Sequence, residues 1–187
     1  MSGPVTFFRN IFTPLFLFAA FSPVILSYST PASAQDIDQK FAEAKGKFLL
    51  TALNYIELPA GADKYNICVV GDKQVFISAR DFYESNKGRL KPTSLKSIDS
   101  GSDGISSCHI VFIGKNYAER DAIMAKISAE KNSVISISDS KNFAAGKGTM
   151  ELFDDDGKLS FIINLKKAKQ PGLKIDSRMI ELAYKTI

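Results

Sequence analysis

The segment Cys108–Gly114 constrains the fold most, because it is apolar and β-branched and lacks the polar alternation of a half-exposed strand. Serines precede it and a glycine closes it, so the run is too short for a stable buried helix. Such a run is typical of a strand covered on both faces. Tyr65–Gly71 and Ser133–Ser138 have the same character, and a helical pattern lies between each neighbouring pair. We therefore expect an α/β fold with a largely parallel central sheet and helices on both faces.

The pattern of apolar, polar and turn residues predicts the remaining helices and strands. Apolar residues recur at intervals of three and four in the stretches that we expect to be helical. A short edge strand and a β-hairpin follow from their own patterns, and the C-terminus is expected to close with a helix. The predicted helices are Asp36–Tyr55, Lys73–Tyr83, Glu119–Lys131 and Asp176–Thr186; the edge strand is Leu95–Ile98, and the hairpin joins Thr149–Phe153 to Lys158–Ile163.

The N-terminus has the layout of an export signal. Arg9 is the only charged residue before Asp36, and the apolar stretch Ile11–Leu26 follows it. Ala34 ends an A-x-A cleavage site, so we expect a cleaved signal peptide over residues 1–34 and one exported domain over residues 35–187. A retained signal anchor is the alternative. It is disfavoured because two prolines interrupt the run, which is also short for a spanning helix.

The overall charge gives little information about partners. The formal net charge is +4, with acids and bases interspersed along the chain. A modest basic excess favours solubility and is weak evidence for nucleic-acid binding. Because the chain also carries an export signal, we expect no nucleic-acid partner.

The two cysteines, Cys68 and Cys108, are expected to form a disulfide in an oxidising compartment. The expected positions of the two cysteines along their strands leave it open whether the bond can form. If the two strands end level at Gly71 and Gly114, the offset between the cysteines is roughly 10 Å, which is beyond disulfide reach. A staggered strand pair, or a Cys108 that still lies in the preceding loop, would bring the two sulfurs together.

The sequence contains no recognisable catalytic set, so an enzyme is not expected. His109 is the only histidine, and its apolar neighbours favour a hydrogen-bonded core residue over a base. No G-x-S-x-G, H-E-x-x-H or paired-cysteine zinc spacing occurs, and we expect neither a metal nor a cofactor. The run Asp154–Gly157 fits a hairpin turn better than a calcium loop. A hydrolase with an unfamiliar site remains the weakest alternative.

Several blocks follow one another along the predicted mature chain in an order that resembles a known family. They are Lys47–Leu49 with Leu58-Pro59, Ile67–Asp72, Cys108–Gly114, Ile137–Asp139 with Phe143-Ala144 and Gly146–Gly148, and Ile163–Ala168 followed by Gly172–Ile180. Their joint occurrence after a signal peptide resembles the YfiR family of periplasmic regulators.

The resemblance implies a periplasmic, often dimeric protein that represses a membrane-bound diguanylate cyclase by holding the cyclase's periplasmic sensing region. A sensor kinase is the alternative membrane partner. An outer-membrane lipoprotein can sequester such a repressor, and redox state can modulate it through disulfides. Some members carry a second cysteine pair late in the chain; Phe143–Leu165 contains no cysteine, so a second redox clamp is excluded here.

A small-ligand sensor is the alternative function. Ligands of open parallel sheets bind beyond the carboxyl ends of the strands, at the point where the strand order reverses. The predicted site therefore consists of Gly71, Asp72, Gly114 and Lys115, with Arg178 as a candidate partner for an anion. The sequence leaves the partner, the signal and the contact surface open.

Overall fold

The computed structural model describes residues 3, 34–57, 61–101, 103–129, 134–169 and 174–187. The signal peptide predicted over residues 1–34 lies almost wholly outside these residues and stays a prediction. Among the described residues, no helix combines the length and the apolar character that a membrane crossing requires.

A seven-stranded sheet forms the centre of the domain, in the order β3-β2-β4-β5-β6-β7-β9. The strands from β3 to β6 in this order are mutually parallel, β7 is antiparallel to β6, and β9 is parallel to β7. The bounds are β2 Tyr65–Val70, β3 Thr93–Ile98, β4 Ile110–Ile113, β5 Ile135–Ser138, β6 Met150–Asp155, β7 Lys158–Ile163 and β9 Lys185–Thr186. A separate antiparallel pair joins β1 (Ile56–Glu57) to β8 (Lys174–Ile175). The predicted α/β class, parallel sheet and C-terminal hairpin are confirmed.

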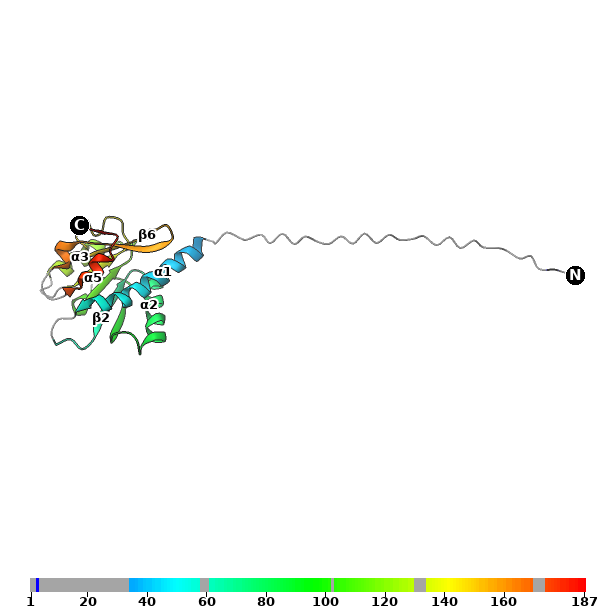
Figure 1. The fold of residues 1–187 in the computed structure, drawn as a ribbon, viewed down its shortest axis with the longest axis horizontal. Coiled ribbons are helices and arrows are strands. Elements are labelled where there is room, and N and C mark those ends of the chain that lie inside the picture. Colours follow the sequence, from blue (N-terminus) through cyan, green and yellow to red (C-terminus); the bar gives the residue numbers. More distant parts are fainter. Residues whose placement is uncertain (1–2, 4–33, 58–60, 102, 130–133, 170–173) are drawn as a thin grey trace. The chain divides into compact units, whose positions relative to one another are not determined.

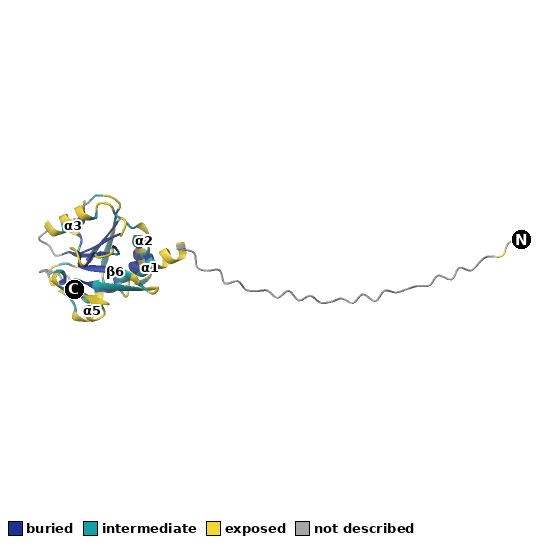
Figure 2. Cartoon of the chain, turned by 90° about the horizontal axis from the view of Figure 1, so that it is seen from above, coloured by how far each residue is buried: buried dark blue, intermediate teal, exposed yellow. Residues whose placement is uncertain are grey.

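Helices cover both faces of the sheet. α1 (Ala34–Thr51) packs against α2 (Lys73–Asn86) on one face, where α5 (Ser177–Glu181) also lies, and α3 (Arg120–Ala129) covers the other face (Figure 1). Figure 2 shows α3 and α5 on opposite sides of the buried strands. The shorter helices are η1 (Ala52–Tyr55), η2 (Ile105–Ser107) and α4 (Leu165–Ala168).

The apolar run Cys108–Gly114 is buried on both sides along β4, as predicted. All four residues of β4 are fully buried, and alternate residues enter different core clusters. Ile110 and Phe112 join the cluster that contains Leu49 of α1, whereas Val111 and Ile113 join the one that contains Ile123 of α3. A strand between two apolar layers has no face on which a polar side chain would be stable, which explains the unbroken run.

The disulfide between Cys68 and Cys108 forms because Cys108 lies in the loop before its strand, which is one of the two arrangements that would allow the bond. Val70 is opposite Ile113 in the ladder, so β2 and β4 do end level. Cys108 does not belong to β4, however; it directly follows η2, in the loop before the strand. From there its Cα comes within 6.0 Å of the Cα of Cys68, a normal separation for a disulfide.

The predicted C-terminal helix is wrong in its second half. α5 ends at Glu181, and the last residues form β9 at the edge of the sheet. Tyr184 N donates to Phe161 O (2.9 Å) and Ile187 N donates to Ile163 O (3.0 Å). The open edge of β7 supplies these partners, and this long-range pairing overrides a helical spacing that would have turned Leu182 inward. Leu182 is instead 61% exposed.

Candidate functional site

The strand order reverses between β2 and β4, and a cleft of about 450 Å³ opens there. The chain leaves β2 for β3 on one side, and later leaves β4 for β5 on the other, so the two exits diverge at the carboxyl edge of the sheet. We call this hollow the carboxyl-edge cleft. Gly71, Asp72, Gly114 and Lys115 line it, together with residues from the first half of α1, so the structure brings four of the five predicted site residues together.

The two glycines allow the strand exits to pack closely. Gly71 has a φ of +68°, and a Cβ built on it would lie 2.4 Å from the ring of Tyr117. A Cβ on Gly114 would lie 3.0 Å from the carbonyl oxygen of Gly71. Both positions therefore require glycine for backbone conformation or close approach, whether or not a ligand binds beside them.

Asp72 also has a structural role, as the N-cap of α2. Its carboxylate accepts a hydrogen bond from Val75 N (3.0 Å) and caps the N-terminus of α2. Lys115 follows directly on the exit of β4, and its exposed side chain faces the same cleft. The cleft thus contains the N-terminus of α2 and the side chain of Lys115, at the edge of the sheet where Gly71 and Gly114 follow two strands.

A buried ion pair at the floor of the cleft was missed by the sequence reasoning. Lys45 Nζ of α1 lies 2.5 Å from Asp139 Oδ2, directly after β5, and the two side chains are 11% and 5% exposed. No described residue donates a hydrogen bond to the second oxygen, Asp139 Oδ1. The signal was present: Lys45 falls in the apolar spacing of α1 between Ala42 and Leu49, and Asp139 is the first residue after a buried strand.

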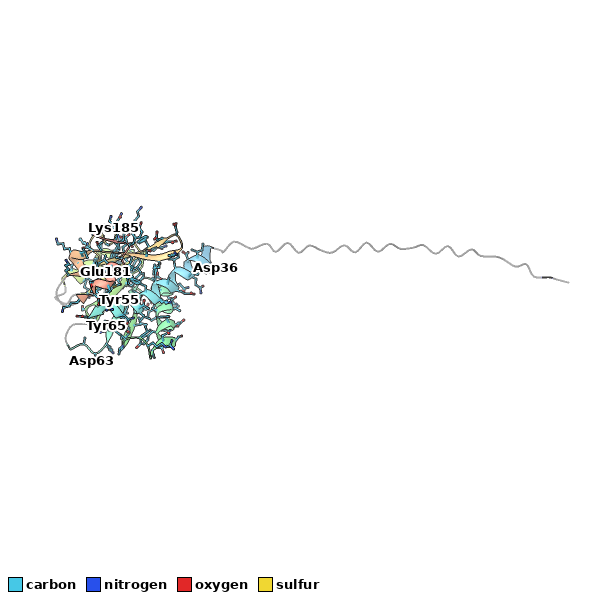
Figure 3. The ribbon with its side chains drawn as sticks, viewed as in Figure 1. Asp36, Tyr55, Asp63, Tyr65, Glu181 and Lys185 are labelled. Atoms are coloured by element: carbon cyan, nitrogen blue, oxygen red, sulfur yellow. A yellow bond between two sulfur atoms is a disulfide. The ribbon has the colours of Figure 1, made fainter. Side chains whose placement is uncertain are left out.

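Arg178 lies elsewhere. Its guanidinium stacks over the ring of Tyr55, 5.6 Å from the centroid, and bonds to Asp176 (2.7 Å). Those hydrogen bonds from Arg178 lower the pKa of the Asp176 carboxyl to about 2. Figure 3 shows Asp36 near the start of α1 and Tyr55 beyond its other end, where η1 stops, and the carboxyl-edge cleft lies along the part of α1 that begins near Asp36. Arg178 therefore contributes nothing to the cleft.

His109 is hydrogen-bonded, as predicted, but only half-buried. Its Nδ1 accepts from Asn66 N (3.1 Å), and its own backbone bridges β2 and β5. Burial lowers the pKa of the imidazole, which favours the neutral ring that this hydrogen bond needs. Within the described ranges, no group of three or more His, Cys, Asp or Glu side chains is arranged to hold a metal ion.

A comparison with known families identifies a relationship that covers most of the chain. A model of the YfiR/HmsC-like family matches residues 42–184, from the middle of α1 to the residue before β9. A search of curated proteins finds no significant relative. The matched stretch contains both cysteines, every strand of the sheet except β9, and the glycines of the carboxyl-edge cleft. The chain therefore belongs to the YfiR/HmsC-like family, a family of periplasmic regulators that are not catalysts.

Proposed function

We propose that the mature protein, residues 35–187, is a periplasmic regulator that binds the sensing region of a membrane-bound diguanylate cyclase and represses it, without catalysing a reaction itself. The observation that carries this proposal is the family match over residues 42–184, which spans nearly the whole folded domain. In this proposal the signal peptide over residues 1–34 directs export and is removed. A sensor kinase of similar layout is the alternative membrane partner.

The disulfide supports a periplasmic site of action. Cys68 and Cys108 are both almost completely buried, and their bond ties the loop before β4 to β2. Stable disulfides of this kind form in oxidising compartments such as the periplasm. The bond fixes the shape of the domain before it meets a partner, which lowers the ordering cost of binding.

Exposed apolar side chains near the C-terminus support function through protein contacts. Leu182, Tyr184 and Ile187 are 61%, 65% and 40% exposed, around the two-residue edge strand β9. Apolar side chains that gather beside an open sheet edge suit a binding surface better than a solvated one. We expect the cyclase region to contact this C-terminal edge, and the same edge is a candidate for homodimer formation or for sequestration by an outer-membrane lipoprotein.

Surface plasmon resonance tests the proposal. Immobilised residues 35–187 should capture the purified periplasmic region of a diguanylate cyclase from the same organism, in a saturable manner. Leu182→Asp should weaken the capture at least tenfold, whereas Arg80→Ala, a matched change at an exposed site on α2, should leave it unchanged. Capture of no cyclase or sensor-kinase region under both oxidising and reducing conditions would contradict the proposal.

A second candidate function, small-ligand sensing, is favoured by one observation. The carboxyl-edge cleft lies at the reversal point of the strand order, where open parallel sheets bind their ligands. A ligand bound there should raise the thermal unfolding temperature, and Lys115→Ala should reduce that rise. If no compound in a panel of small polar metabolites raises the unfolding temperature, this candidate fails.

A further inference from the structure

A second cleft, of about 560 Å³, lies between α1 and the β6–β7 hairpin. We call it the hairpin cleft; its walls include Ile37, Phe41, Asp139, Glu151, Phe153 and Tyr184. It adjoins the carboxyl-edge cleft, because Lys45 and Asp139 line both. Its volume falls within the range of small-molecule sites. We propose that the hairpin cleft binds a small amine with an aromatic or aliphatic body, whose ammonium group donates to Asp139 Oδ1.

The floor of the hairpin cleft holds an acceptor that needs a donor. The side chain of Asp139 is 5% exposed, and only its Oδ2 is paired, with Lys45 Nζ. For Asp139 Oδ1, the described part of the chain offers no hydrogen-bond donor. A buried carboxylate oxygen without a donor has lost its hydration free energy and gained nothing in return. A ligand that supplies an N–H donor recovers that free energy, whereas a ligand that carries only acceptors does not.

Glu151 makes the floor rigid. It is a buried residue, and its two oxygens accept hydrogen bonds from the backbone N–H groups of Asn142 (3.0 Å) and Ala144 (3.2 Å). These bonds hold the turn that follows Asp139, so the carboxylate of Asp139 is positioned before any ligand arrives. Preorganisation of this kind lowers the entropic cost of binding.

Two exposed apolar side chains stand among charged ones at the mouth of the cleft. Ile37 and Tyr184 are 48% and 65% exposed, and both line the opening. The ring of Tyr184 meets that of Phe153 edge to face, with centroids 5.1 Å apart. A ligand body placed here covers exposed apolar surface, and aromatic faces also attract a cation. Apolar side chains at the mouth and a carboxylate at the floor therefore fit an amphipathic molecule.

The charge at the floor of the cleft selects an amine over an acid. The lining carries the carboxylates Asp38, Asp139, Glu151 and Asp154 and the lysines Lys45, Lys115 and Lys141. Lys45 is already engaged by Asp139, and Glu151 is satisfied by neutral N–H groups. The free acceptor at the floor is anionic, so a carboxylate ligand would be repelled there. The inference is independent of cyclase repression, since it concerns the isolated chain.

Isothermal titration calorimetry on residues 35–187 tests the inference with three probes of similar shape. 2-Phenylethylamine should bind at least tenfold more tightly than 2-phenylethanol, and 3-phenylpropionate should bind weakest. Asp139→Asn should weaken amine binding at least tenfold. Because that change touches a buried ion pair, Tyr184→Ala, at an exposed position, serves as the second variant and should weaken binding several-fold.

Leu182→Ala is the matched control, because Leu182 is as exposed as Tyr184 but does not line the cleft. It should leave amine binding unchanged, although a change at Leu182 is expected to impair capture of the cyclase region. The inference is overturned if the amine does not bind at millimolar concentration, if the carboxylate binds best, or if Tyr184→Ala and Leu182→Ala bind the amine equally well. None of these outcomes bears on repression of the cyclase.

Discussion

Breaking the disulfide between Cys68 and Cys108 should destabilise the fold by about 4 kcal/mol. The cysteines are 40 residues apart in the sequence. Closing a loop of that length in the unfolded chain removes roughly 13 cal/mol/K of entropy, which is about 4 kcal/mol at 25 °C. For a domain of this size, such a loss lowers the thermal midpoint by roughly 8–16 °C.

Urea unfolding of residues 35–187, with and without reductant, measures this value. The reduced chain keeps every atom of the core except for two added hydrogens, so the difference reports the cross-link and not a cavity. At a slope of about 2 kcal/mol per molar urea, the midpoint should fall by about 2 M. The double variant Cys68→Ala/Cys108→Ala is the control, and reductant should leave its midpoint unchanged.

The rate of reduction is informative too. The two cysteines are 2% and 3% exposed, so a reductant can reach the sulfurs only when this part of the fold opens. Reduction of the native protein should therefore be slow and should accelerate with urea. If the oxidised and reduced chains unfold at the same urea concentration, the loop-closure reasoning is refuted.

Three further predictions concern single side chains. Lys45→Met leaves the buried carboxylate of Asp139 without its cation and should cost about 3–5 kcal/mol in urea unfolding, most of which Lys45→Met/Asp139→Leu should recover. Gly71→Ala should cost more than Gly157→Ala, since both glycines have positive φ but only Gly71 has a neighbour, Tyr117, where the Cβ would be placed; equal costs in urea unfolding would contradict the packing argument. Burial lowers the pKa of His109 in the folded state below its usual 6.5, so protons bind the unfolded state more readily. Stability should therefore be full above pH 6.5 and fall as the pH drops toward the folded pKa, with a slope that His109→Gln removes in pH-dependent unfolding.

The parallel sheet could be predicted from the sequence because its buried strands carry an unmistakable pattern. Ile67–Val70 and Ile110–Ile113 are apolar on both faces, and their short length and the glycine that follows each favour a strand over a buried helix. The level ends of the two strands could be predicted as well, from the glycine that follows each strand. The position of Cys108 could not, because the boundary between loop and strand depends on the packing of η2.

The structure of the last C-terminal residues, by contrast, could not be predicted from the sequence. Ile180, Leu182 and Ala183 have helical spacing, yet the backbone pairs with β7, which is adjacent only in the folded state. A local pattern carries no information about a partner that is distant in the sequence. The same reason explains why Arg178 was expected near the carboxyl-edge cleft and instead lies over Tyr55.

The candidate site could be predicted in part. The rule of the carboxyl edge depends on topology alone, and Gly71, Asp72, Gly114 and Lys115 do line one cleft there; that a ligand binds them stays a prediction. The Lys45–Asp139 pair could not be assigned, since the sequence does not tell which lysine of an amphipathic helix faces which strand end. A lysine in the apolar spacing of a helix is nevertheless a signal for a buried partner.

The most direct test of the proposed repression is the rate of cyclic di-GMP synthesis by a full-length membrane-bound diguanylate cyclase from the same organism, reconstituted in vesicles. Addition of oxidised residues 35–187 on the periplasmic side should lower that rate in a saturable manner, and Leu182→Asp should raise the concentration needed at least tenfold. A rate that stays constant at every concentration of a folded, oxidised chain, with each such cyclase, would contradict the account.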